Sequence, residues 1–301
     1  MSISLTILGC HSATPRTFAH PTSQYLEINN RRFLIDCGEG TQVQLRKYKI
    51  KFSTITDVFI SHLHGDHYFG LIGLISTFGL LNRQNDLNIY APKGLKEIIN
   101  LQLKTSNSWP QFTINFHELN SSKSELIFED DKTEVYTIPL EHRVYTNGFL
   151  FKEKLVCDYQ NLKNGKDFIE ADGHVITNEK LTFSPNKPLS YAFCSDTVFK
   201  PDIASIIKDV DLLYHESTFL KDRQEIALKT KHSTAEEAGK IAKLANAKQL
   251  ILGHFSSRYD NLNLFKQEAL SVFNNVIVAK EGKTIKIDSK VPNKLIVSSL
   301  N

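Results

Sequence analysis

A cluster of histidine and aspartate residues is the part of the sequence that most clearly indicates chemistry. His62, His64, Asp66 and His67 lie within six residues, directly after the apolar residues 58–60. Side chains alternate along an extended backbone, so His62 and His64 point to the same side, and the glycine at position 65 permits a turn that places Asp66 and His67 at the start of a helix. Imidazole and carboxylate groups are ligands of catalytic zinc sites, which keep one position open for water. A single histidine beside a strand is usually packed or solvent-exposed, but four such groups together predict a metal site.

Three more apolar runs end in a residue that could bind the same metal. Runs that end at residues 140, 194 and 252 precede His142, Asp196 and His254, respectively. Functional groups gather at the carboxyl ends of strands in α/β sheets, so these residues can converge although they are far apart in the sequence. Alone, Asp196 would be interpreted as a turn or helix-capping residue, but beside the histidines its carboxylate could bridge two metal ions. No cysteine belongs to the set, so we expect a catalytic site rather than a closed structural zinc site.

The composition excludes several other classes of protein. The 301 residues include 36 Lys and Arg against 33 Asp and Glu, a net charge of +3, which argues against binding polyanions through overall charge alone. The four cysteines form no C-x-x-C pair, so neither a zinc finger nor a dense disulfide framework is expected. The longest uncharged apolar stretch, residues 68–81, is shorter than the roughly 20 residues of a membrane span, and the N-terminus does not resemble a signal peptide. We therefore expect a globular, cytoplasmic protein that does not enter a membrane.

Short β-type runs alternate with helical segments along the chain, which is the pattern of an α/β fold. The expected strands cover residues 3–8, 24–28, 33–36, 58–60, 87–91, 134–140, 189–194, 211–214, 249–252 and 276–279. The expected helices cover residues 41–48, 68–81, 93–105, 200–207, 234–245 and 262–273. Residues 152–187 show the least pattern, and we expect them to form an excursion from the core rather than a second domain.

Beyond the metal-binding run, several segments together resemble one enzyme family. The H-x-H-x-D-H pattern after an apolar strand resembles the metallo-β-lactamase superfamily. More narrowly, the chain resembles ribonuclease Z, the endonuclease that removes 3′ trailers from precursor tRNA, in the segments D-C-G-E-G-T-Q at 36–42, S-D-T at 195–197, H-E-S-T-F at 215–219, H-S-T at 232–234 and H-F-S-S-R-Y at 254–259. The resemblance implies the metallo-β-lactamase αββα four-layer sandwich, an α/β fold, as a single domain of residues 1–301 with a short inserted substrate-binding arm at residues 150–188.

The resemblance also implies which residues bind metal. It assigns one zinc ion to His62, His64 and His142, a second zinc ion to Asp66, His67 and His254, and a bridging position to Asp196. The expected cofactor is therefore two Zn²⁺ per subunit. Two adjacent metal ions can lower the pKa of a shared water and stabilise the attacking and leaving oxygens of an in-line displacement at phosphorus.

Four residues are implied in catalysis and substrate binding. Asp66 is expected to orient or deprotonate the attacking water, and His232, held as a cation by Glu216, to protonate the leaving ribose oxygen. Without the resemblance, Glu216 would be interpreted as a turn residue and His232 as a surface residue. Arg258 is expected to bind a phosphate in a bidentate manner, the alternative being an ordinary surface arginine. The four cations at residues 46–51 are equally consistent with a helix end that complements its dipole and with a tRNA phosphate contact.

These features predict a zinc-dependent endoribonuclease that leaves a 3′-hydroxyl on the tRNA and a 5′-phosphate on the trailer. A homodimer follows from the resemblance, because the family's arm reaches the substrate of a partner subunit. The interval between residues 143 and 195 departs from the family's Gly- and Pro-rich arm, since it instead contains Lys152, Lys154, Lys163 and Lys166. The alternatives are a two-metal phosphodiesterase or sulfatase acting on small esters, and a non-catalytic RNA-binding protein on a decayed fold, against which the complete ligand set argues.

Overall fold

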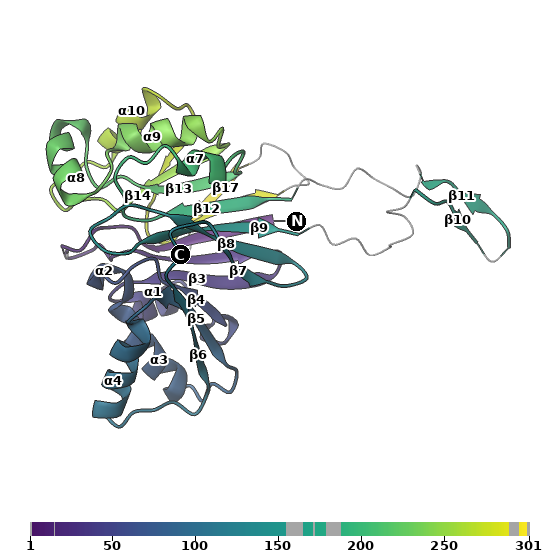
Figure 1. The fold of residues 1–301 in the computed structure, drawn as a ribbon, viewed down its shortest axis with the longest axis horizontal. Helices are drawn as coiled ribbons and strands as arrows, with labels where there is room; N and C mark the ends of the chain where they lie inside the picture. The colour runs from purple at the N-terminus through teal and green to yellow at the C-terminus, as the bar shows by residue number, and fades with distance from the viewer. Residues whose placement is uncertain are drawn as a thin grey trace.

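Two β-sheets pack face to face at the centre of the protein, and helices cover the outer face of each sheet (Figure 1). The computed structural model describes residues 2–14, 16–154, 165–170, 172–178, 188–288 and 295–299. The succession of helices, sheet, sheet and helices is the four-layer αββα sandwich that the sequence predicts.

The described residues form an eight-stranded and a seven-stranded central sheet. The first has the spatial order β17 (Leu295–Ser299), β16 (Lys283–Asp288), β1 (Ser2–Gly9), β2 (Ser23–Ile28), β3 (Arg31–Cys37), β4 (Asp57–Phe59), β5 (Leu87–Pro92) and β6 (Ile114–Leu119). The second has the order β15 (Val276–Val278), β14 (Gln249–Gly253), β13 (Leu212–Glu216), β12 (Ser190–Cys194), β9 (Asn147–Glu153), β8 (Thr133–Pro139) and β7 (Leu126–Glu129).

The helices divide between the two sheets. Those beside the first sheet are α1 (Thr41–Lys47), α2 (Gly65–Tyr68), α3 (Gly70–Leu80) and α4 (Leu95–Thr105). Those beside the second are α7 (Ile203–Ile206), α8 (Gln224–Thr230), α9 (Ala235–Leu244) and α10 (Asn263–Leu270). The N-terminus of α9 is closed by a capping box in which Thr234 and Glu237 each accept the other's backbone N–H.

The alternation of side chains along the strands gives the first sheet two apolar faces. In β3, Phe33 packs between the sheets, whereas Leu34 packs toward α1 and α3. In β4, Phe59 lies between the sheets with its ring 5.3 Å from that of Phe149 in β9. Because both faces of these strands are buried, polar groups are left to the strand ends, and the site is built there.

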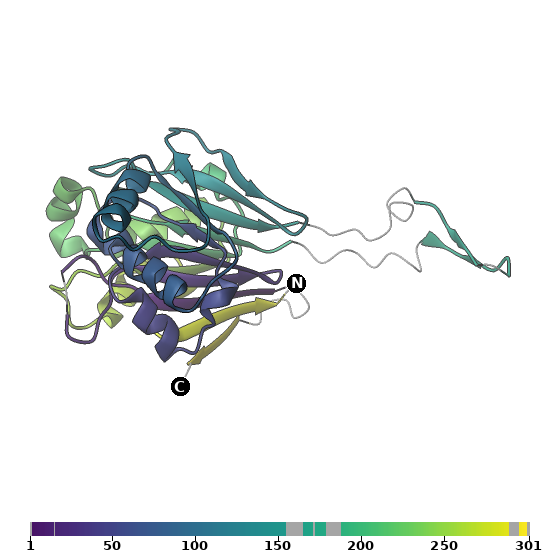
Figure 2. The ribbon, with the colours of Figure 1, turned by 90° about the horizontal axis from the view of Figure 1, so that it is seen from below.

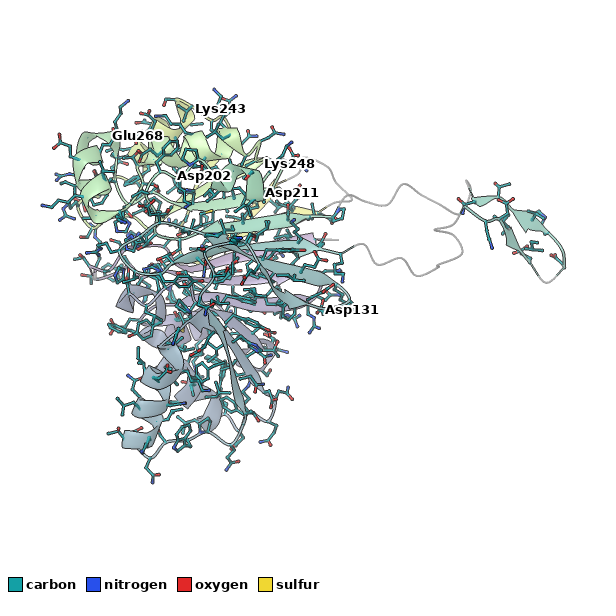
Figure 3. The ribbon with its side chains drawn as sticks, viewed as in Figure 1. Asp131, Asp202, Asp211, Lys243, Lys248 and Glu268 are labelled. Carbon is teal, nitrogen blue, oxygen red and sulfur yellow. The ribbon has the colours of Figure 1, made fainter. Side chains whose placement is uncertain are left out.

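The register of three parallel strands aligns the ends that carry functional residues. Cys194 at the end of β12 lies opposite His215 in β13, which lies opposite Leu252 in β14. At the other end of these strands, Asp211 accepts a backbone hydrogen bond from the first residue of β12 (2.8 Å) and pairs with Lys248; both residues are labelled in Figure 3. The residues that follow β12, β13 and β14 therefore emerge side by side at one edge of the sandwich.

A small hairpin lies away from the sandwich. It consists of β10 (Phe168–Ile169) and β11 (Val175–Ile176), and it projects beyond the body of the protein in both views (Figures 1 and 2). The strands that flank the insertion pair with each other, since the backbone N–H of Glu153 donates to Leu189 O (2.9 Å). Residues 150–153 belong to β9, and the substrate-binding arm expected at residues 150–188 stays a prediction.

The four lysines expected in the arm have different environments. Lys152 lies on β9 with its ammonium group 5.0 Å from the ring centre of Tyr136, and Lys154 pairs with Glu129 (2.6 Å). Lys166 is exposed next to the hairpin, and Lys163 lies outside the described residues. The insertion is therefore less basic, over its described part, than the sequence alone indicates.

Each expected strand and helix is present, with small differences in bounds. The helix expected over residues 68–81 is two helices that meet at Phe69, and the one expected over 200–207 shortens to α7. The patterns missed β6, β7, β16, β17 and α8, most of whose side chains are exposed or half-buried, and β9, which begins with the turn-like pair Asn147-Gly148. They also missed the β10–β11 hairpin. Among the described residues, no helix has the length and apolar character needed to cross a membrane.

Candidate metal centre

The seven predicted metal ligands meet at one edge of the sandwich. His62 and His64 follow β4, Asp66 and His67 lie in α2, and His142, Asp196 and His254 follow β8, β12 and β14, respectively. The groups His62–His64–His142–Asp196 and Asp66–His67–His254 each bring their ligating atoms within 4.8 Å of one another. Three strands of one sheet and one strand of the other therefore contribute to a single cluster.

The first ligand set surrounds a point where three ring nitrogens face one another. His62 Nε2 lies 3.1 Å from His64 Nδ1, and His142 Nε2 lies 3.2 Å from the same nitrogen. Nitrogens that coordinate one tetrahedral zinc ion at about 2.05 Å are about 3.3 Å apart. The spacing of the three imidazoles therefore fits a shared cation of this kind.

The second ligand set lies on the other side of Asp196. Asp66 Oδ2 is 3.4 Å from His67 Nε2 and 3.3 Å from His254 Nε2. Asp196 Oδ1 approaches the same two nitrogens, at 3.5 Å and 3.3 Å. Its other oxygen, Oδ2, lies 3.5 Å from His62 Nε2 in the first set. The two oxygens of Asp196 thus face different ligand sets, as those of a bridging carboxylate would.

Two buried polar atoms in this cluster indicate that a cation belongs there. His67 Nε2 and Asp196 Oδ1 have no hydrogen-bond partner among the described residues. Leaving a buried donor or acceptor unpaired costs about 1–3 kcal/mol. A metal ion coordinated by both atoms would remove that cost, and the donor set of imidazoles and carboxylates suits zinc.

Hydrogen bonds on the far side of the rings orient four of the histidines. Their acceptors, each approached by Nδ1, are Ser61 Oγ for His62 (3.0 Å), Asp36 Oδ2 for His67 (2.6 Å), Lys231 O for His142 (2.7 Å) and Thr218 Oγ1 for His254 (2.8 Å). A bond at Nδ1 sets the tautomer that leaves Nε2 free as a ligand. Burial also lowers the pKa of His142 to about 4, which favours the neutral ring that a metal requires.

Asp36 is a supporting residue whose role could not be predicted from sequence beyond its membership of a motif. Its side chain is fully buried, and besides His67 it accepts the backbone N–H of Ser61 (2.7 Å) and the Ser61 hydroxyl (2.9 Å). Its φ of 54° is in the left-handed region, which is costly for a residue other than glycine and is typical of functional sites. An acidic residue at the end of the apolar strand β3 was the only signal that could have revealed it.

The turn after β3 supports the metal-binding loop through its backbone. A Cβ on Gly38 would lie 2.5 Å from Asp66 O, and a Cβ on Gly70 would lie 2.1 Å from Gly38 O. Both positions therefore require glycine, because any side chain would separate the two loops. This contact explains why the D-C-G-E-G segment accompanies the histidine run.

Glu216 and His232 form a pair beside the ligand sets. Glu216 Oε1 is 3.0 Å from His232 Nδ1, and the carboxylate also accepts the backbone N–H groups of Thr197, Thr218 and Ser233. Although burial opposes its charge, His232 lowers the pKa of Glu216. Burial also opposes the charge of His232, yet Glu216 and Asp196 raise the pKa of His232 to about 9. The pair therefore favours the protonated form of His232, whose ring centre lies 4.9 Å from that of His142.

Other candidates lie outside this cluster. Arg258 is exposed four residues after His254, and its guanidinium contacts Ser256 Oγ at 3.4 Å. Arg46 and Lys47 of the basic segment lie over the rings of Phe52 and Tyr48, respectively. The described cysteines are buried free thiols that take no part in the ligand groups, and Cys157 lies outside the described residues.

The chain is similar in sequence and in fold to proteins of one known family. The family model of the beta-lactamase superfamily domain matches residues 31–255. Ribonuclease Z of Bacteroides fragilis is 44% identical over 299 residues, covering 94% of this chain and 98% of that protein. Ribonuclease Z of Porphyromonas gingivalis is 41% identical over 300 residues, covering 94% and 99%. The crystal structure of human tRNase Z, short form, superposes with a TM-score of 0.73 at 29% identity, covering 94% of this chain and 98% of that one.

The position of Asp36 behind His67 leads to a prediction about metal affinity. Asp36→Asn removes the charge that orients the His67 ring, and we expect metal affinity to fall about 10- to 100-fold, as for other residues that hold a metal ligand. Competition with a chelator measures this loss, and far-UV circular dichroism checks that the fold is retained.

The matched control is Asp131→Asn, at the exposed β7–β8 turn (Figure 3), because β8 starts after this turn and ends three residues before His142. The control should bind metal as the unmodified protein does. Equal affinities for Asp36→Asn and the control would contradict the supporting role of Asp36.

Proposed function

The chain belongs to the ribonuclease Z family of the metallo-β-lactamase superfamily, and from that premise we propose that it removes the 3′ trailer from precursor tRNA as a two-zinc enzyme. It is a hydrolase that acts as an endoribonuclease. The products of the proposed reaction are a 3′-hydroxyl on the tRNA and a 5′-phosphate on the trailer. The observation that supports the proposal most directly is that two ligand sets share Asp196 and lie against the Glu216–His232 pair.

The seven ligands divide between two metal positions in this proposal. The first zinc ion would be held by His62, His64 and His142 and the second by Asp66, His67 and His254, with Asp196 within reach of both positions. Zinc in such a pair supplies charge for the phosphoryl oxygens and a nucleophilic water at neutral pH. Asp66, whose carboxylate lies between His67 and His254, orients the attacking water or takes its proton.

His232 and Glu216 act on the leaving group. The ribose 3′ oxygen leaves as an alkoxide unless it is protonated, and His232 is the residue that can supply the proton. Because Nδ1 of His232 is held by Glu216, its Nε2 is the atom left to donate. Glu216 fixes the orientation of the ring and stabilises the imidazolium between catalytic cycles.

The proposal also includes substrate binding by the insertion, away from the cluster of metal ligands. The inserted residues between β9 and β12 form a tRNA-binding arm, and the projecting β10–β11 hairpin gives it reach to a part of the tRNA distant from the cleavage site (Figures 1 and 2). The described hairpin has Lys166 beside Asp167, Glu170 and Asp172, so its described part does not bind phosphates through excess positive charge.

Three further elements complete the proposal. Arg258 contacts a substrate phosphate near the cluster, since its charge is exposed just after His254. Two subunits form a homodimer in which the arm of one reaches the tRNA on the other. The protein works in the cytoplasm, where precursor tRNA is processed.

Cleavage of a precursor tRNA is the direct test of the proposed function. We expect the zinc-loaded protein to cut after the last nucleotide of the mature tRNA, and a chelator to abolish cutting until zinc is restored. End-labelled substrate and terminal phosphate analysis identify the bond and the product ends. Efficient turnover of a small phosphodiester or sulfate ester without any cleavage of precursor tRNA would instead support a small-ester hydrolase.

The proton-donor role of His232 predicts a dependence on the leaving group. His232→Ala should lower kcat for precursor tRNA about 10²- to 10⁴-fold, the usual contribution of a general acid. For a small aryl phosphodiester, whose phenolate leaves without protonation, the loss should be much smaller. Steady-state kinetics on both substrates and zinc analysis measure these effects.

A control histidine on an edge strand completes that test. His117→Ala in β6 should leave kcat unchanged on both substrates, because His117 is exposed and stacks on Tyr90 away from the ligand sets. Equal losses on the two substrates for His232→Ala, with zinc retained, would rule out proton donation to the leaving group.

The pairing of the strands that flank the insertion allows a test of the arm. Deleting residues 155–187 and joining the ends with a short Gly/Ser linker preserves this pairing, since Ser190 lies opposite Lys152. We expect KM for precursor tRNA to rise about tenfold, equivalent to about 1.4 kcal/mol of docking energy, with unchanged turnover of the small diester. Unchanged KM for precursor tRNA would show that the insertion does not bind the substrate.

A further inference from the structure

A cavity opens beside the metal-binding loop and is not used by the chemistry proposed above. Its volume is about 610 Å³, within the range of small-molecule sites. Its walls come from three parts of the chain that are distant in sequence: residues 12–14 together with residues 16 and 19–21, the turn at Glu39 and Gly40, and the segment that contains Gly65, Asp66 and Phe69. A metal ligand, Asp66, therefore lies in the wall of a space large enough for a nucleobase.

Phe69 presents an aromatic face in this cavity. Its side chain is 60% exposed, which is high for a phenylalanine next to a buried site. The ring packs against Gly65, because a Cβ on Gly65 would lie 2.2 Å from Phe69 Cε2. The glycine thus allows the ring to lie against the backbone next to Asp66, at the point where α2 and α3 meet.

The charges around the cavity favour a base over a phosphate. Arg16 is the one arginine in the wall, and it is already engaged, since its guanidinium donates to Tyr259 O (3.0 Å) and pairs with Asp260. Glu39 also lines the cavity, and its negative charge would repel a phosphate. An aromatic ring with an adjacent carboxylate instead suits the flat face and the N–H donors of a nucleobase.

The position of the cavity indicates which nucleotide it would take. Neither His232 nor Glu216 lines the cavity, which reaches the ligand sets on the side of Asp66. In the proposed reaction His232 protonates the 3′ oxygen of the mature tRNA, so the last nucleotide of the tRNA lies on the side of His232. The nucleoside on the other side of the scissile phosphate is the first of the trailer.

We propose that this cavity binds the first nucleotide of the trailer, with its base stacked on Phe69. The inference depends on the function proposed above and adds to it a contact that positions the substrate across the cleaved bond. Stacking of a base on an aromatic side chain is tolerant of base identity, so this contact would fix the position of the trailer and not its sequence.

A double-mutant cycle tests the proposal with the zinc-loaded protein. One partner of the cycle is Phe69→Ala, and the other is a precursor tRNA in which the first trailer nucleotide is abasic. We expect Phe69→Ala to raise KM about tenfold on the intact substrate, in the range of one stacking contact, and to have almost no effect on the abasic one. Phe69→Tyr should restore the KM of the unmodified protein, because it keeps the ring.

Two further measurements separate stacking from a general disturbance. Phe69→Leu keeps apolar volume over Gly65 but has no ring. It should therefore retain zinc, and, like Phe69→Ala, it should raise KM for the intact substrate and not for the abasic one. A 2-aminopurine at the first trailer position should lose fluorescence on binding to the unmodified protein and much less on binding to Phe69→Leu. Trp109→Ala, a comparably exposed aromatic residue (55%) after α4, should change none of these values.

The possible results distinguish this proposal from the function on which it rests. If precursor tRNA is cleaved but Phe69→Leu affects intact and abasic substrates equally, or neither, then the cavity does not bind the first trailer base. If the unmodified protein does not cleave precursor tRNA at all, then the proposed function itself is wrong.

Discussion

The rest of the site depends on one constraint: ring nitrogens and carboxylate oxygens must be held close together in the cluster of metal ligands. His62 Nε2 and His142 Nε2 lie 3.1 Å and 3.2 Å from His64 Nδ1, and Asp196 directs one oxygen to each ligand set. Without a cation this arrangement is unfavourable, since His67 Nε2 and Asp196 Oδ1 are buried and have no hydrogen-bond partner among the described residues. The fold therefore holds its ligands in place through bonds made elsewhere, and metal binding must add to the free energy of unfolding.

The supporting bonds connect the metal ligands to the proposed acid. The hydroxyl of Thr218 donates to Glu216 (2.8 Å) and lies 2.8 Å from His254 Nδ1, so one small side chain joins a ligand of the second set to the residue that holds His232. His254 itself has a φ of 60°, in the left-handed region, as Asp36 does. Of these two strained residues, His254 is a ligand of the second set and Asp36 supports another ligand of that set, His67, so the sandwich has to stabilise both conformations.

Much of this site could be predicted from sequence because its members are residue types with few other reasons to follow an apolar strand. The metal ligands could be identified this way, and their meeting followed from the rule that strand ends converge. The Glu216–His232 pair followed only from the family resemblance, because His232 comes after a helix and Glu216 alone would be interpreted as a turn residue. Asp36, Ser61 and Thr218 could not be assigned roles, because their function exists only in contacts across the fold. The cavity beside Phe69 was hidden for a different reason. Residues 68–81 form one apolar run, and no periodicity shows that the helix breaks at Phe69 and exposes its ring.

The antiparallel pairing of β9 with β12 has a consequence for how this enzyme can diverge. Within the sheet, β9 and β12 form a hairpin whose loop is the insertion, and hydrogen bonds between Glu153 and Leu189 close this loop. The entropic cost of closing a loop grows only slowly, by about 0.6 kcal/mol for each doubling of its length. Lengthening, shortening or replacing the insertion therefore has little effect on the free energy of folding and leaves the ligand sets undisturbed. Natural selection can therefore change the substrate-binding segment of such a nuclease without changing its cleavage chemistry.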